Sequence, residues 1–510
     1  MKIHSLFKLN DSFALIAGAA LTLAFAPYQL YPLAIICPAL LLALWLNVTK
    51  QRAFFRGWLF GLGFFGFGVY WIFISIHTFG DVPILLSGIV TGGFIAVLAL
   101  FPALCGYVFN RYFAQINNIN FFCAFPAIWV AFEWLRSFLF TGFPWLMLGY
   151  SQINSPLRGY APLFGVFSVS LAVLISSALL VKMLLNIKQK HYRGCLLNLT
   201  VFAVIWIVGG YFSHITWTKP FGSPIKVSLV QGNIPQEIKW SPDYVQTTLE
   251  QYKKLSAPYW NSKMVIWPES AIPLPMQDAQ DFLMGLDTLA KKHGAAFITG
   301  IPVQLPQSNH YYNAVIVLGE GYGFYLKHRL VPFGEYIPLQ SLLNSILNIL
   351  HIPISDFVPA TARAQPLEVG KLKIATFICY EIAFPEMVIS RDATINMLLT
   401  VSNDAWFGHS IAQAQHLEMG QMRALEMGRP VLFVSNNGIT AIIKADGRIQ
   451  SAAPPFQAYV LTDTVEPTEG TTPWQFWGMD PLLATLIILI LIAMRRRRNN
   501  DKINSSFKNS

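Results

Sequence analysis

Charged residues are scarce in this chain, and their scarcity excludes a protein that is soluble throughout. Asp, Glu, Lys and Arg make up 12% of the 510 residues, against 54% hydrophobic residues, whereas soluble domains carry about 25% charged residues. The shortage is uneven, because long apolar runs fill residues 13–211 while charges and polar turns recur over residues 225–465. The sequence therefore predicts a membrane region and a water-exposed domain in one chain.

Cysteine is also scarce, so each thiol can be placed. Of the five cysteines, Cys37, Cys105 and Cys123 lie in apolar runs, Cys195 lies close to another run, and Cys379 is the only one in residues 225–465. In an oxidising compartment, Cys379 has no disulfide partner within its own domain. Composition alone favours a small buried hydrophobic residue, since free cysteine is usually buried. A nucleophile is the alternative.

Motifs for cofactors, metals and nucleic acids are missing. The sequence has no Gly-rich phosphate loop and no Ser nucleophile elbow, and it predicts neither a cofactor nor a metal. We interpret His409 and His416 as solvent-facing or capping residues, because neither has a Cys or carboxylate pair of ligand type nearby. The net charge of +10 does not indicate nucleic acid, since residues 225–465 hold 17 Lys and Arg against 19 Asp and Glu. The basic excess lies in the membrane region, where it indicates topology.

Eight apolar segments are candidates for crossing a bilayer, which takes about 20 residues. The predicted spans are 13–27, 30–46, 54–73, 82–108, 121–138, 163–184, 197–211 and 474–494. The first segment could instead be a signal peptide, because it ends in the A-x-A pattern of a cleavage site at Ala24–Ala26. Pro27 directly after that pattern argues against cleavage.

Lys and Arg fall at every second connection and in the tail at Arg495–Arg498. The positive-inside rule then places both termini in the cytoplasm and residues 213–473 outside, in the periplasm of a bacterium. The predicted domains are a seven-span region (1–212), this outer domain, an eighth span and a basic tail (495–510) without a fold of its own.

The outer domain alternates strand-like runs with helical patterns, which predicts an α/β sandwich. We expect strands in 226–232, 264–270, 295–303, 313–319, 323–331, 373–381, 395–404, 430–438, 439–447 and 458–465, and helices in 244–255, 279–293 and 411–427. Glu269, Lys327 and Cys379 each lie in or follow a strand-like run. A thiol needs a base, and an acyl oxyanion needs a cation or hydrogen-bond donor. These three side chains can supply such roles without a histidine.

The segments WPES, KHRLVPFGEYIP, CYE and SNDAWFG, in this order, resemble the nitrilase superfamily of Cys-Glu-Lys enzymes. Together with FEWLRSFLFTGFPWLMLGYSQ, YYNA, QHLEMGQMRALEMGRP and SNNGITAII, they resemble the family of apolipoprotein N-acyltransferases over nearly the whole chain. The resemblance implies a polytopic α-helical membrane domain joined to a nitrilase-like αββα sandwich domain.

The resemblance also implies roles for individual residues. Cys379 would be the nucleophile, Glu269 the general base and Lys327 the group that stabilises the oxyanion. Glu335 would orient Lys327 or the oxyanion site, although it could be a plain surface carboxylate.

Tyr380 and Glu381 match the residues beside the nucleophile, although Tyr380 could serve core packing alone. We expect Trp406 to lie on the lipid side of the site. The resemblance places Glu133 and Arg136 near a lipid entrance. The aromatic residues at the outer membrane interface would be Phe143, Trp145 and Tyr150. A structural ion pair is the alternative for Glu133 and Arg136.

The expected reaction moves an acyl chain from the sn-1 ester of a phospholipid, through a thioester on Cys379, to the α-amino group of the diacylglyceryl-cysteine that begins an apolipoprotein. We expect ping-pong kinetics and a monomer in the inner membrane, with apolar loops 333–354 and 406–416 guiding lipid. Two alternatives remain: a membrane-tethered amidase of the same fold, and a transporter whose outer domain only binds ligand.

Overall fold

The computed structural model describes residues 2–332, 334–336, 356–389 and 392–508. The chain divides into two compact units. Unit 1 comprises Met1–Phe73, Ile84–Ile215 and Trp477–Ser510, and unit 2 comprises Ile74–Pro83 and Thr216–Phe476. The segment Ile74–Pro83 therefore groups with the outer domain, which the sequence did not predict. Residues 337–354 of the expected lipid-guiding loop lie outside the described residues.

Unit 1 is helical, and a helix lies in each of the eight predicted spans. The long helices are α1 (Lys2–Leu21), α2 (Leu33–Trp45), α3 (Lys50–Gly68), α5 (Ile84–Leu98), α6 (Leu100–Tyr112), α7 (Phe125–Phe138), α9 (Val166–Lys188), α10 (Tyr192–Ser213) and α17 (Asp480–Lys508). α17 continues through the arginines to Lys508, so the basic tail extends this helix; that it has no fold of its own stays a prediction.

Within the described residues, four helical stretches are long and apolar enough to cross a membrane by themselves: Ile84–Tyr112, Asn120–Thr141, Val166–Lys188 and Tyr192–Ser213. Lys50–Gly68 and Trp71–Phe79 would form a fifth, bent by 53°. The first two predicted spans correspond to shorter apolar helices, Asp11–Ala24 and Leu33–Trp45.

Glycine allows α1 and α3 to pack with their backbones in close contact. A Cβ atom on Gly18 would lie 1.9 Å from the carbonyl oxygen of Phe60, and one on Gly63 would lie 2.1 Å from that of Leu15. Small residues permit such close packing between helices in membranes, where dispersion and packing drive helix association.

Unit 2 contains two large sheets. The six-stranded sheet has the order β14 (Tyr459–Val465), β2 (Ile225–Gln231), β3 (Met264–Ile266), β4 (Ala296–Gln304), β5 (Tyr311–Gly319) and β7 (Phe324–Leu326). The seven-stranded sheet has the order β13 (Ile449–Ala452), β12 (Ala441–Ile443), β11 (Val431–Ser435), β10 (Met397–Ser402), β9 (Leu372–Ile378), β8 (Leu367–Val369) and β6 (Gly321–Tyr322). Within the part of the chain that the structure describes, β1 (Thr218–Pro220) also pairs with β15 (Thr468–Gly470).

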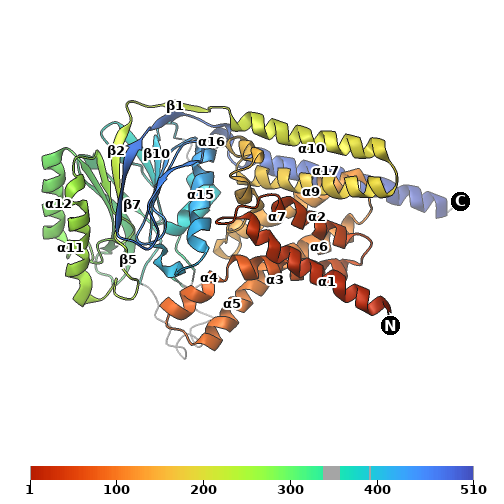
Figure 1. Ribbon diagram of the computed structural model, residues 1–510, viewed down its shortest axis with the longest axis horizontal. Coiled ribbons are helices and arrows are strands. Elements are labelled where there is room, and N and C mark those ends of the chain that lie inside the picture. The colour runs from red at the N-terminus through yellow and green to blue at the C-terminus, as the bar shows by residue number, and fades with distance from the viewer. Residues whose placement is uncertain (1, 333, 337–355, 390–391, 509–510) are drawn as a thin grey trace. The chain divides into compact units, whose positions relative to one another are not determined.

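The two sheets share one core, and helices cover their outer faces. Buried residues of both sheets form a single cluster that includes Leu229, Ile266, Leu399 and Val434. In Figure 1, α11 (Val245–Ser256) and α12 (Gln280–His293) lie on one side of the strands and α15 (Ala412–Met427) lies on the other. This is the expected αββα sandwich.

The strand directions bring several polar side chains to common edges. β2, β3 and β4 run parallel, as do β9, β10 and β11. Glu269 follows β3, Cys379 follows β9 and Asn403 follows β10. Because the carboxyl ends of parallel strands meet at one edge of a sheet, these residues can converge on one site.

Candidate active site

Cys379 sits at a sharp strand-to-helix turn. β9 ends at Ile378, and Cys379 begins a short 3₁₀ helix, Cys379–Ala383, with a backbone φ of +53°. A positive φ is uncommon outside glycine, and where it persists the surrounding structure must hold it in place. The thiol is partly buried. Such a turn aims the side chain away from the sheet, which suits a nucleophile better than a core residue.

Glu269 is buried and held by three donors. Its Oε1 accepts from Asn313 Nδ2 at 2.7 Å and from Lys327 Nζ at 3.2 Å, and its Oε2 accepts from the backbone N–H of Asn403 at 2.9 Å. Gly300 packs against the backbone of Glu269 and Ser270. A Cβ atom on Gly300 would lie 2.4 Å from the backbone nitrogen of Ser270, so only glycine fits there. The carboxylate is thereby fixed in one orientation.

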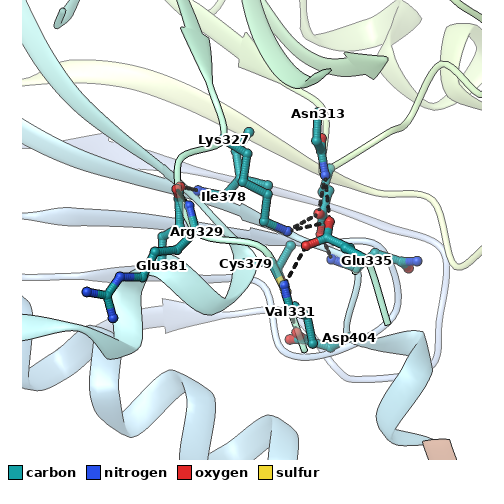
Figure 2. Close-up of polar contacts among 12 residues, drawn as sticks. Asn313, Lys327, Arg329, Val331, Glu335, Ile378, Cys379, Glu381 and Asp404 are labelled. Atoms are coloured by element: carbon teal, nitrogen blue, oxygen red, sulfur yellow. Dashed lines mark hydrogen bonds and ion pairs between the residues drawn. The ribbon is translucent and has the colours of Figure 1, made fainter. Parts of the chain in front are cut away.

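Lys327 joins two carboxylates, and Figure 2 shows it beside one of them, that of Glu335. Its buried Nζ donates to Glu335 Oε1 at 2.7 Å as well as to Glu269. Burial alone would lower the pKa of this ammonium, but the charges of Glu269 and Glu335 outweigh burial and raise that pKa above its ordinary value. Lys327 is therefore a permanent cation beside the thiol.

Glu335 is not a plain surface carboxylate. One oxygen accepts from Lys327, and Oε2 accepts from the backbone N–H of Val331 at 2.8 Å. Only 14% of its side chain is exposed. This geometry agrees with the role that the resemblance implies, orienting Lys327 or the oxyanion site, and that role stays a prediction.

The thiol of Cys379 is neutral in the resting site. Burial raises its pKa well above the ordinary value, and the negative charges of Glu269 and Asp404 raise it further, while Lys327 and the Ser402 hydroxyl oppose them. A neutral thiol must lose its proton before it can attack a carbonyl carbon. The ionised carboxylate of Glu269 can accept that proton, and Lys327 can balance the charge that develops on the substrate oxygen.

Glu381 supports the site rather than reacting in it. It is fully buried, and its carboxylate accepts from the N–H groups of His328, Arg329 and Ile378 and from the Tyr325 hydroxyl, at 2.7 to 3.0 Å. These bonds tie the segment that carries Lys327 to the turn that carries Cys379. Burial raises the pKa of Glu381, and its backbone hydrogen bonds oppose that rise.

Tyr380, the residue after the nucleophile, is buried, and its ring packs edge-on against Phe384 with centroids 4.9 Å apart. This contact agrees with the alternative of core packing. A chemical role for the Tyr380 side chain stays a prediction.

Three further site residues were not predicted from the sequence. Asn313 and Asn403 hold the two oxygens of Glu269, and Lys239 donates from its buried Nζ to the Glu269 backbone oxygen at 3.0 Å. Burial lowers the pKa of Lys239 to about 8, although the charges of Glu269 and Cys379 oppose that shift. Asn313 lies in the YYNA segment that contributed to the resemblance, so that motif was a usable signal.

The interpretation of His416 was wrong. It is not solvent-facing but 1% exposed, with Nδ1 3.0 Å from Asp404 Oδ1 and Nε2 3.1 Å from the backbone oxygen of Cys379. The reason is that α15 lies buried against β11 and β12, so its polar face is turned inward. His409 is exposed and stacks on Phe456 with ring centroids 3.8 Å apart.

Trp406 lies in unit 2, where it contacts the segment Ile74–Pro83. The Ser75 hydroxyl donates to the Trp406 backbone oxygen at 2.7 Å, and the Phe79 ring packs edge-on against the indole. The Trp406 side chain is 37% exposed. A partly exposed tryptophan suits a lipid-facing rim, but contact with lipid stays a prediction.

Glu133, Arg136 and Trp145 lie in unit 1 and are buried. Glu133 Oε1 accepts from the Leu148 N–H at 2.9 Å, and Arg136 Nη1 donates to the backbone oxygens of Phe143 and Trp145 at 2.7 and 2.6 Å. Both charges thus hold the segment after α7 through its backbone. Their place near a lipid entrance stays a prediction.

Known protein families and relatives match nearly the whole chain. Residues 17–179 match the model of the apolipoprotein N-acyltransferase N-terminal domain, and residues 226–472 match that of carbon-nitrogen hydrolases. The apolipoprotein N-acyltransferase of Coxiella burnetii is 43% identical over 94% of this chain and 99% of its own length. That of Methylococcus capsulatus is 40% identical over 92% of this chain and 93% of its own length.

Among solved structures, the chain is similar to XC1258 from Xanthomonas campestris, described as a CN-hydrolase superfamily protein. The likeness covers 48% of this chain and 91% of that one, with 20% sequence identity and a TM-score of 0.38.

Proposed function

This chain belongs to the apolipoprotein N-acyltransferase family, and from that premise we propose that Cys379 carries an acyl group from a phospholipid to the N-terminal amine of a diacylated lipoprotein. The chain is a membrane protein and an N-acyltransferase. The donor, the intermediate and the residue roles are the substance of the proposal. The observation that carries it is the buried network in which Lys327 joins Glu269 and Glu335 beside the Cys379 turn.

In the first half-reaction, Glu269 accepts the thiol proton while the Cys379 sulfur attacks the ester carbonyl of the phospholipid. The carbonyl π electrons move to its oxygen, and Lys327 stabilises that oxyanion. When the oxyanion collapses, the bond to the glycerol oxygen breaks, and the proton held by Glu269 passes to that oxygen. The products are a lysophospholipid and an acyl thioester on Cys379.

In the second half-reaction, the neutral α-amine of the lipoprotein attacks the thioester carbonyl. The same Lys327 ammonium stabilises the second oxyanion, and Glu269 accepts a proton from the amine. Collapse breaks the carbon–sulfur bond, and the proton returns to the thiolate. Glu335 keeps Lys327 aimed through both steps.

The membrane region explains why a hydrolase-like fold transfers an acyl chain. Both substrates carry lipid chains, so the site must open toward a bilayer, where little water reaches the thioester. By the positive-inside rule, unit 2 faces the periplasm of a bacterial inner membrane and both termini are cytoplasmic. The protein acts as a monomer.

The test is mass spectrometry of a synthetic diacylated lipopeptide incubated with the protein and phospholipid in detergent. We expect the lipopeptide to gain the mass of one acyl chain with the natural protein and with Cys195→Ser, and to gain none with Cys379→Ser. Release of free fatty acid without modified lipopeptide would instead identify an amidase-like hydrolase. Uptake into reconstituted vesicles with no lipid product would identify a transporter.

A further inference from the structure

Behind the nucleophile lies a buried pair, Asp404 and His416, that the proposed mechanism does not use. Asp404 is 0% exposed and His416 is 1% exposed. His416 reaches across from α15 to the backbone oxygen of Cys379. Through His416, the pair is therefore in contact with the main chain of the nucleophile.

Asp404 faces hydrogen-bond donors on both of its carboxyl oxygens. The Ser402 hydroxyl donates to Oδ1 at 2.6 Å and the Ser435 hydroxyl donates to Oδ2 at 3.1 Å. The Ser435 oxygen in turn accepts from the N–H of Gly438, so its proton is free for Asp404. A buried carboxyl group that faces donors on both oxygens is stabilised as the carboxylate.

His416 lies between two acceptors. Nδ1 faces the Asp404 carboxylate, and Nε2 faces the carbonyl oxygen of Cys379, which can only accept. Both hydrogen bonds exist together only when each ring nitrogen carries a proton. With Asp404 as the carboxylate, these two contacts require an imidazolium, and the ring packs edge-on against Phe433 and Phe407.

The peptide bond that follows Cys379 links this cation to the reacting carbonyl. The bond is trans, so the N–H of Tyr380 and the C=O of Cys379 point to opposite edges of one rigid plane. A donor on the oxygen fixes that plane and draws electron density from the amide, which strengthens the N–H as a donor. This matters at Cys379, where the positive φ must be held by its surroundings.

From these contacts we infer that Asp404 and His416 are positioning residues that orient and polarise the Cys379–Tyr380 peptide, so that its N–H stabilises the substrate oxyanion together with Lys327. The inference rests on the proposed function of Cys379 as the acylated nucleophile. It predicts that the pair affects steps that form an oxyanion and leaves attack on a saturated carbon nearly unchanged.

Two reagents separate these effects. A long-chain aldehyde such as hexadecanal accepts the Cys379 sulfur at its carbonyl carbon, the carbonyl π electrons move to the oxygen, and Glu269 keeps the thiol proton, so the bound hemithioacetal carries an oxyanion. Iodoacetamide is displaced at a saturated carbon, loses iodide and forms no oxyanion. The aldehyde dissociation constant and the pH-independent limit of the alkylation rate are measured on the full-length protein.

For His416→Gln and Asp404→Asn, we expect aldehyde binding to weaken about tenfold or more, with the alkylation limit changed less than about twofold. The exposed His293→Gln, at the end of α12, is the matched control and should match the natural protein in both measurements. Equal losses in both reactions, or no loss in either, would overturn the inference and leave the pair as packing. A natural protein that binds no aldehyde and is not alkylated at Cys379 would instead overturn the proposed function.

Because both variants alter buried groups, a measurement on the natural protein provides a second test. With ¹⁵N-labelled histidine, one of the ten histidines should show two protonated ring nitrogens at neutral pH, and that signal should shift when Cys379 binds hexadecanal. A spectrum without such a histidine, or one that does not respond to the aldehyde, contradicts the inference even if neither variant folds.

Discussion

Neighbouring charges shift the pKa of the Cys379 thiol in opposite directions, and the pH dependence of its alkylation tests this. Burial raises the pKa of the thiol, Glu269 raises it further and Lys327 lowers it. Glu269→Gln should therefore move the pH midpoint of iodoacetamide alkylation downward, although it removes the base and should abolish acyl transfer. Lys327→Gln should move the midpoint upward. The measurement is the alkylation rate of the Cys379 peptide against pH, and midpoints that move in the reverse directions would disprove this electrostatic arrangement.

Glu381 is a buried acidic residue that we expect to stabilise the fold. Its four donors lie on the segment before Val331 and on the end of β9, and a glutamine of the same size keeps only one acceptor oxygen. Glu381→Gln should lower the free energy of unfolding by about 2–4 kcal/mol. Glu386→Gln, which removes a partly exposed pairing with Arg329, is the matched control and should cost less than about 1 kcal/mol. Thermal unfolding in detergent measures both, and equal losses would refute the assigned role.

The grouping of site residues was predictable where a motif carried it and not where the fold alone created the contact. Glu269, Lys327 and Glu335 lie together as the resemblance implied. Asn403 reaches Glu269 only when the two sheets pack together, across 134 residues of sequence. His416 reaches Cys379 only when α15 packs on its sheet, across 37 residues. A buried polar side chain on a helix such as α15 leaves the same local pattern as an exposed one, which is why His416 was assigned to the surface.

Elements with strong periodicity were predicted well, and short ones were not. The helix expected at 279–293 is observed as Gln280–His293, and the one at 411–427 as Ala412–Met427. The two-residue strand β6 and the pair β1–β15 were missed. Such segments bury too few side chains to show alternation, and their pairing depends on neighbours distant in sequence.

The segment Ile74–Pro83 should stabilise the loop that carries Trp406, because Ser75 and Phe79 both contact that residue. Phe79→Ala should increase amide hydrogen exchange in residues 403–411 several-fold, since the loop loses its apolar support. The control is Phe67→Ala, which truncates an exposed side chain of unit 1. Exchange is followed by mass spectrometry, and unchanged protection in both variants would mean that the contact does not hold the loop.

For the whole molecule, the distribution of Lys and Arg predicts the side of the membrane on which each unit is exposed. The exposed positions Lys292 in unit 2 and Gln189 between α9 and α10 can each be replaced by cysteine in a background lacking Cys195 and Cys379. We expect a membrane-impermeant maleimide to label Lys292→Cys from the periplasmic side and to label Gln189→Cys only after the membrane is opened. The reverse pattern would invert the topology.

The proposed function requires that Cys379 hold an acyl group between a lipid donor and a lipidated acceptor. The most direct measurement is the intact mass of the Cys379 peptide after the protein is incubated with phospholipid alone and then with diacylated lipopeptide. We predict that phospholipid adds one acyl chain, which hydroxylamine removes and the lipopeptide discharges, and that Cys379→Ala never carries it while Cys195→Ala does. A preparation that transfers acyl chains to the lipopeptide without ever acylating Cys379 would contradict the account.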